Sequence, residues 1–174
     1  MNAQPAQALR VALVGCGAIG HAVLELLRAD PAVVVQTVVV LRQAMAELAP
    51  RLPQVRVCER LPLGAGRPDL VVECAGHAAL LEHVLPALAA GVPAVVASIG
   101  ALHDASLVEA LAEAATQGRT QVQLVAGAIG AIDALAAARL GGLSRVQYTG
   151  RKPLRGWLST PAESLCRLDA LTDE

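Results

Sequence analysis

Three glycines near the start of the chain are spaced so that the backbone around them can hold a phosphate group. Gly15, Gly17 and Gly20 fit the pattern G-x-G-x-x-G, between an aliphatic run at residues 10–14 and a helical pattern at residues 18–29. Gly15 permits a tight turn, Gly17 leaves room for a pyrophosphate, and Gly20 lets the helix pack closely on the strand. The free N–H groups of the helix N-terminus would face the phosphate. The pattern therefore predicts a dinucleotide-binding site.

The residues after the second predicted strand bear on which dinucleotide is bound. In such a site an acid at this point binds the ribose 2′-hydroxyl of NAD, whereas an arginine accepts the 2′-phosphate of NADP. The strand covers residues 33–41 and is followed by Arg42 and Gln43, without an acid. We expect Arg42 to let NADP bind beside NAD. The alternative is that Arg42 is only a solvated arginine at a strand end.

Small residues follow two further predicted strands. Cys74 and Ala75 lie at the end of the strand at residues 69–76, and Ser98 ends the strand at residues 92–98. Ligands of open parallel sheets bind beyond the carboxyl ends of the strands, so these residues should lie beside the cofactor. Two histidines, His77 and His103, are near strand ends and are the candidate acids or bases; capping of the next helix is the alternative for His77.

The predicted elements define an α/β fold, a Rossmann-type doubly wound parallel sheet, over residues 1–126. After the glycine turn, Ile19, Val23, Leu26 and Leu27 recur at helical spacing, which predicts a helix. Residues 127–174 are expected to begin a second, α+β substrate domain. Its predicted elements are a helix at 132–140, a strand-like segment at 144–149 and an amphipathic stretch at 162–171. The six predicted strands of the sheet cover residues 10–14, 33–41, 55–58, 69–76, 92–98 and 121–125.

Composition narrows the class of protein. The chain is 55% hydrophobic but only 1% aromatic, with no Phe, which suits a sheet buried on both faces by aliphatic side chains. The net charge is −1 without a basic stripe, so we expect no nucleic-acid partner. No leader or membrane-spanning pattern is present, which predicts a cytoplasmic location. The four cysteines are scattered, and no metal site is expected.

Five segments together resemble the L-aspartate dehydrogenase family: 15–20 (GCGAIG), 69–77 (DLVVECAGH), 97–102 (ASIGAL), 127–133 (GAIGAID) and 151–153 (RKP). The resemblance implies an NAD(P)-dependent enzyme that oxidises L-aspartate to iminoaspartate, which hydrolyses to oxaloacetate and ammonia or feeds NAD biosynthesis. It also implies that Lys152 binds a substrate carboxylate, the alternative being a solvated lysine. By position, the cofactor would be held by Gly15, Gly17, Ala18, Ile19 and Gly20 at the pyrophosphate, and by Cys74, Ala75, Ser98 and Ala128 near the nicotinamide.

The end of the chain departs from this family. No Asn follows Asn2 and no His follows His103, so the Asn-rich cofactor segment and the histidine regarded as catalytic in the family are missing. We expect a fragment or a shortened paralogue. Three functions remain open: the dinucleotide-binding part of an aspartate dehydrogenase, a non-catalytic NAD(P)-binding module, and a related enzyme such as a homoserine dehydrogenase or dihydrodipicolinate reductase. An incomplete second domain should expose apolar surface, which predicts a homodimer.

Overall fold

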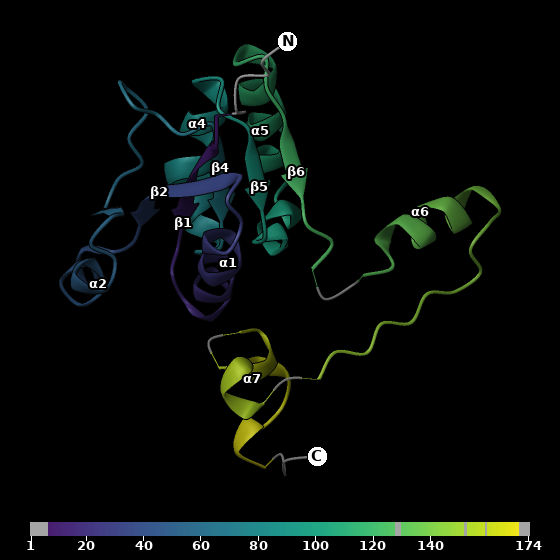
Figure 1. Cartoon of the computed structure of the whole chain (residues 1–174). Coiled ribbons are helices and arrows are strands. Elements are labelled where there is room, and N and C mark those ends of the chain that lie inside the picture. The colour runs from purple at the N-terminus through teal and green to yellow at the C-terminus, as the bar shows by residue number, and fades with distance from the viewer. Residues whose placement is uncertain (1–6, 128–129, 152, 159, 171–174) are drawn as a thin grey trace. The chain divides into compact units, whose positions relative to one another are not determined.

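The computed structural model describes residues 7–127, 130–151, 153–158 and 160–170 (Figure 1). The chain divides into two compact units, Met1–Ala131 and Ile132–Glu174. The first unit contains the sheet and the predicted dinucleotide site. In the described part of the chain, no helix has both the length and the apolar character needed to cross a membrane.

A six-stranded parallel sheet forms the centre of the first unit, in the order β3-β2-β1-β4-β5-β6. This is the strand order of a Rossmann fold, with the order reversing between β1 and β4, and it confirms the predicted fold class. Each predicted strand is present, mostly shortened by one to four residues. The strands are β1 (Leu9–Val14), β2 (Val33–Val39), β3 (Arg56–Cys58), β4 (Leu70–Glu73), β5 (Ala94–Val96) and β6 (Val122–Leu124).

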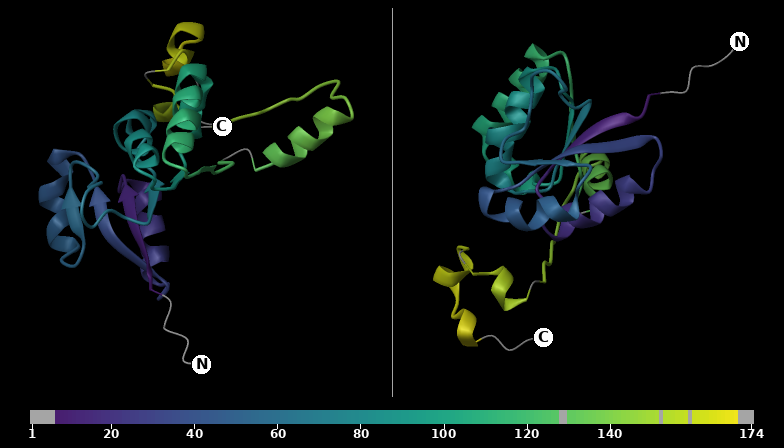
Figure 2. Two further views of the ribbon diagram at one scale, coloured as in Figure 1. Left: turned by 90° about the horizontal axis from the view of Figure 1, so that it is seen from above. Right: turned by 60° about the vertical axis from the view of Figure 1, so that its left-hand side comes forward.

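Helices cover both faces of this sheet, and consecutive strand residues supply the two cores (Figure 2). Leu13 and Val38 pack with Leu24 of α1 on one face, whereas Val14 and Val39 pack with the helices of the other face. Alternation of side chains along each strand explains this division. The helices are α1 (Ala18–Arg28), α2 (Arg42–Leu48) with the 3-10 turn Ala49–Arg51, α3 (His77–Ala79), α4 (Leu85–Ala89), the 3-10 turn Ile99–His103 and α5 (Ala105–Gln117).

The helix predicted from the apolar spacing is α1, and its buried face includes only some of those apolar residues. Ile19 and Leu26 are 63% and 74% exposed, whereas Gly20 and Leu24 are buried. Gly20 lies against the carbonyl of Gly15 and so sets the rotation of the helix. The stripe that faces the sheet is centred on positions 20, 24 and 27, which leaves Ile19 and Leu26 outside it.

Two features of the helices have local causes. The helix interrupted by Pro86 runs through a π-helical turn, Leu80–Val84, between α3 and α4. Proline has no N–H to continue the regular hydrogen-bond ladder, which accounts for the change of register next to it. Asp104 is the N-cap of α5, because its carboxylate accepts the N–H of Ser106 at 2.9 Å.

The second unit contains α6 (Ile132–Leu140), the 3-10 turn Leu154–Gly156, α7 (Ala162–Leu165) and the 3-10 turn Leu168–Ala170. The predicted strand at residues 144–149 is wrong: these residues are exposed and form no strand. A strand needs a hydrogen-bonded neighbour, and the described residues of this unit provide none. The amphipathic stretch predicted at 162–171 begins with α7, which ends at Leu165, and continues in the 3-10 turn Leu168–Ala170, where Leu168 is buried; residue 171 lies outside the described residues.

Candidate functional site

The glycine turn between β1 and α1 has the geometry that its sequence predicts. Gly15 has a φ of +90°, and a Cβ atom there would lie 2.6 Å from the Cα of Ala75. A Cβ on Gly20 would lie 2.2 Å from the carbonyl oxygen of Gly15, so helix and strand meet too closely for any side chain. At Gly17 the added atom would meet nothing within 4 Å. Gly17 therefore borders open space, where a bulky ligand group can approach the backbone.

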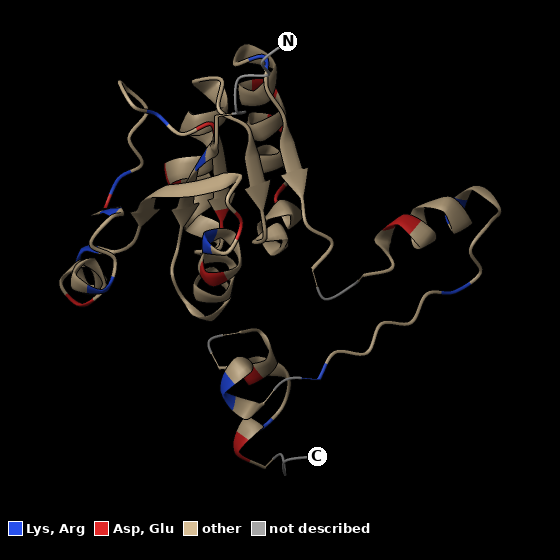
Figure 3. Ribbon diagram, viewed as in Figure 1, with Lys and Arg blue, Asp and Glu red and all other residues tan. Residues whose placement is uncertain are grey.

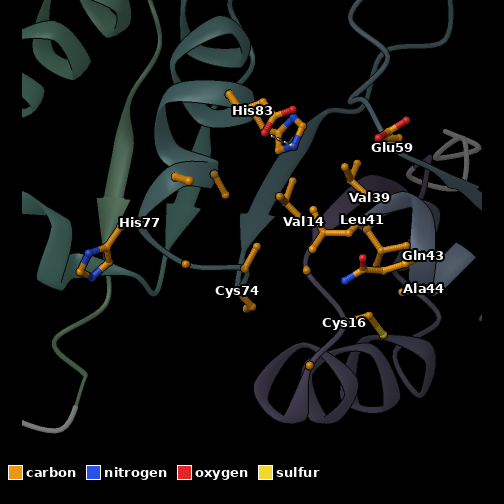
Figure 4. Close-up of a pocket in the computed structure, with 18 residues that line it drawn as sticks. Val14, Cys16, Val39, Leu41, Gln43, Ala44, Glu59, Cys74, His77 and His83 are labelled. Carbon is orange, nitrogen blue, oxygen red and sulfur yellow. Dashed lines mark ion pairs between the residues drawn. The ribbon is translucent and has the colours of Figure 1, made fainter. Parts of the chain in front are cut away.

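A pocket of about 590 Å³ opens beside this turn (Figure 4). It lies at the carboxyl ends of β1, β2 and β4, where ligands of such sheets bind. Figure 4 shows His77 at one end, and Leu41, Gln43 and Ala44 at the other. Its walls are formed by Val14, Gly15, Cys16, Gly17, Val39, Val40, Leu41, Gln43, Ala44, Glu59, Cys74, Ala75, Gly76, His77, Ala78, Ala79, Glu82 and His83.

The pocket includes part of the predicted cofactor-binding set. Gly15, Gly17, Cys74 and Ala75 line it directly. The other described members do not line it: Ala18, Ile19 and Gly20 open α1, Arg42 opens α2, and Ser98 follows β5. Ala128, and also Lys152, lie outside the described residues.

A buried carboxylate that the sequence analysis missed joins two loops of the site. Glu73, the last residue of β4, is 0% exposed. It accepts hydrogen bonds from the N–H groups of Ala75 at 2.7 Å and Gly76 at 2.9 Å. Ser98 donates its N–H at 3.1 Å and its hydroxyl at 2.8 Å to the same carboxylate. Glu73 thus fixes the loops after β4 and β5, which carry three of the predicted nicotinamide-side residues. The sequence feature that could have identified this residue is that Glu73 is the single acid in the otherwise aliphatic strand LVVE.

The two candidate histidines lie together at this edge of the sheet. His77 is the first residue of α3 and His103 ends the turn after β5; their ring centroids are 6.4 Å apart. His103 Nδ1 lies 2.8 Å from the carbonyl oxygen of Gly100, and a Cβ on Gly100 would lie 2.9 Å from His77 Nε2. Both side chains are exposed, and His77 lines the pocket whereas His103 does not.

The third histidine at the site, His83, is different, because it is buried in the π-helical turn. Burial lowers the pKa of His83, although Glu82, whose carboxylate is 3.9 Å away, opposes this shift. A neutral imidazole adds polarity to the wall of the pocket without charge. Burial likewise raises the pKa of the Cys16 and Cys74 thiols, which are therefore poor nucleophiles at neutral pH.

Charged groups of both signs lie on α2 and near it (Figure 3). Arg42 forms an ion pair with Glu59, with 2.8 Å between Nη2 and Oε2. In the described part of the chain, no group of three or more His, Cys, Asp or Glu residues is arranged to hold a metal ion.

The parallel sheet, its strand order and the glycine turn at its carboxyl edge define a dinucleotide-binding domain. The family model described as "Homoserine dehydrogenase, NAD binding domain" matches residues 15–124, and the chain belongs to this family of NAD-binding domains. The resemblance to L-aspartate dehydrogenases is also confirmed: the chain is 58% identical over 167 residues to the L-aspartate dehydrogenase of Ralstonia nicotianae. That match covers 94% of this chain but 62% of the relative, so the chain spans less than two thirds of the relative's length.

Solved structures show the same fold. Aspartate dehydrogenase from Thermotoga maritima is 23% identical, with a TM-score of 0.55 over 75% of this chain and 51% of that one. The WlbA dehydrogenase from Bordetella pertussis, in complex with NADH and UDP-GlcNAcA, is 15% identical, with a TM-score of 0.65 over 87% of this chain and 49% of that one. At these identities the likeness concerns the fold alone.

Proposed function

We propose that this chain is the cofactor-binding portion of an NAD(P)-dependent L-aspartate dehydrogenase, which oxidises L-aspartate to iminoaspartate. The observation that carries the proposal is the pocket beside the glycine turn, in a chain 58% identical to an L-aspartate dehydrogenase over 94% of its length. The family model named for homoserine dehydrogenase covers only residues 15–124, the part that would hold the cofactor and not the substrate.

In this proposal different residues at the pocket bind different parts of the cofactor. The open backbone at Gly17 and the start of α1 hold the pyrophosphate. Cys74 and Ala75 line the nicotinamide side, with Ser98 held beside them by Glu73. The bound nicotinamide supplies the hydride acceptor for the α-carbon of aspartate. His77, which lines the pocket and is exposed, is the first candidate for accepting a proton from the substrate amine or from water.

Binding and turnover can be measured separately on the 174-residue protein. NADH and NADPH are each titrated by nicotinamide fluorescence, and NAD⁺ or NADP⁺ is then mixed with L-aspartate while absorbance is followed at the reduced nicotinamide band. Saturable binding without turnover supports a cofactor-binding portion. Turnover lost in His77→Asn places the proton acceptor within this chain. Absence of binding by the folded protein would contradict the proposal.

L-Homoserine serves as the comparison substrate. Formation of reduced cofactor with L-homoserine and not with L-aspartate would assign the chain to a different dehydrogenase. A protein that binds NADH but remains inactive with both amino acids, even when a separately expressed C-terminal portion of the 58% identical relative is added, would favour a non-catalytic binding module.

A further inference from the structure

The pocket has an acidic residue in its wall that does not come from β2. An acid at the end of β2 commonly binds the ribose 2′-hydroxyl, but in this chain Arg42 and Gln43 follow that strand. In the structure, Glu59 lines the pocket together with Val40 and Leu41. Glu59 follows β3, the strand hydrogen-bonded to β2, and so reaches the site from the neighbouring strand.

The register of the two strands fixes the place of Glu59. Cys58, the last residue of β3, is paired with Val39, and its carbonyl accepts the N–H of Val40 at 2.9 Å. The next residue, Glu59, must therefore lie beside the segment after β2. Its side chain is 42% exposed, pairs with Arg42 and contributes to the wall of the pocket.

The charges around this end of the pocket favour a ligand without a 2′-phosphate. Of the residues that line it in the described part of the chain, Glu59 and Glu82 are acidic, and none is Lys or Arg. Arg42 is not in the lining; its side chain is 84% exposed, and its Nη2 lies 2.8 Å from the carboxylate of Glu59. A 2′-phosphate bound in the pocket would thus lie closer to the carboxylate of Glu59 than to the guanidinium of Arg42.

Resting on the proposed NAD(P)-binding function, we infer that Glu59 is the specificity-determining residue for the dinucleotide. Its carboxylate accepts a hydrogen bond from the adenosine ribose 2′-hydroxyl of NAD. The same carboxylate repels the 2′-phosphate of NADP and keeps Arg42 paired. Arg42 contacts a 2′-phosphate only when Glu59 releases it, so the protein prefers NAD.

The test compares dissociation constants of NADH and NADPH for four forms of the 174-residue protein: wild type, Glu59→Gln, Glu59→Gln with Arg42→Ala, and Glu25→Gln. Glu25 is the matched control, because it pairs with Arg28 at 3.6 Å near the far end of α1 and does not line the pocket. Far-UV circular dichroism verifies that each form is folded.

We expect wild type to bind NADH more tightly than NADPH. Removing one charge from beside the 2′-phosphate should lower the NADPH-to-NADH ratio of dissociation constants by about fivefold, equal to roughly 1 kcal/mol. Adding Arg42→Ala to Glu59→Gln should raise the ratio again, because the freed arginine supplies the phosphate contact. Glu25→Gln should leave the ratio as in wild type.

A ratio that is the same in Glu59→Gln and wild type, while both forms bind both cofactors, would overturn the role of Glu59 and leave the dinucleotide site intact. Folded wild-type protein that binds neither NADH nor NADPH would instead overturn the proposed function, and the inference with it.

Discussion

Ser98 donates both its backbone N–H and its hydroxyl to the carboxylate of Glu73, joining residues 25 positions apart in sequence. With the N–H groups of Ala75 and Gly76, all four partners of this buried carboxylate are donors. An amide in its place must direct its NH₂ group at one of these donors. The pair therefore couples the ends of β4 and β5 by charge as well as by geometry.

Replacing Glu73 should cost more stability than replacing Ser98. Glu73→Gln leaves buried donors unpaired, and we expect a loss of about 2 to 4 kcal/mol in the free energy of unfolding. Ser98→Ala removes one hydroxyl and should cost about 1 kcal/mol. Urea denaturation of both variants measures the difference. Equal stabilities of Glu73→Gln and wild type would show that the network contributes nothing.

A side chain added at Gly17 should lower cofactor affinity, whereas one added at Gly20 should lower the stability of the fold. A side chain at Gly17 enters open space, so Gly17→Val should fold as wild type yet lose NADH affinity by about tenfold or more, roughly 1.4 kcal/mol. A Cβ at Gly20 would lie 2.2 Å from the Gly15 carbonyl oxygen. Gly20→Ala should therefore lower the free energy of unfolding by about 1 to 3 kcal/mol. NADH titration and urea denaturation of both variants separate the two effects, and a Gly17→Val protein with unchanged affinity would place the pyrophosphate elsewhere.

The ion pair between Arg10 and Asp69 should make stability depend on pH in the acid range. Arg10 holds the pKa of Asp69 at about 2, below its ordinary value of 3.8, by hydrogen bonds from its side chain and backbone N–H. A lowered pKa stabilises the fold above the ordinary value, and this contribution is lost as pH falls through about 2. Because the Asp69 side chain is 39% exposed, screening limits the effect, and Asp69→Asn should cost about 1 kcal/mol at neutral pH.

Urea denaturation between pH 7 and pH 2 measures this dependence. The difference between wild type and Asp69→Asn should shrink as pH falls from 4 towards 2. Asp169→Asn is the control, since its pair with Arg167 is fully at the surface and should be unimportant. A difference that stays constant over this range would contradict the assignment of the shift to Asp69.

Self-association is expected from the apolar side chains of the second unit. Leu140 is 91% and Leu165 is 83% exposed, and α6 has no buried residue. Apolar area of this kind is stabilised when another surface covers it, so we expect a homodimer. Light scattering at rising concentration should show the dimer, and Leu140→Glu should weaken it. A strictly monomeric wild type at high concentration would refute this.

The sequence alone determined the class of fold and the place of the glycine turn. Buried parallel strands are near-continuous aliphatic runs, and the six runs are separated by helical patterns. Gly20 could be assigned because the group it packs on, the carbonyl of Gly15, is close in sequence, and Gly15 because the turn itself requires a positive φ. The rotation of α1 about its axis could not be assigned from the sequence. Ile19 and Leu26 lie outside the core, because the close packing of Gly20 on Gly15 orients the helix.

Only the tertiary structure showed which distant residues meet at the pocket. The sequence does not show what Glu73 contacts, and its hydrogen bond with Ser98 becomes visible only when β4 and β5 are paired in the sheet. Glu59 directly follows β3, and only the pairing of β3 with β2 places it at the pocket and beside Arg42. Segment 144–149 had the composition of a strand, but no partner strand is present among the described residues around it. Periodicity is local along the chain, whereas hydrogen-bond partners and strand neighbours are set by contacts between residues far apart in sequence.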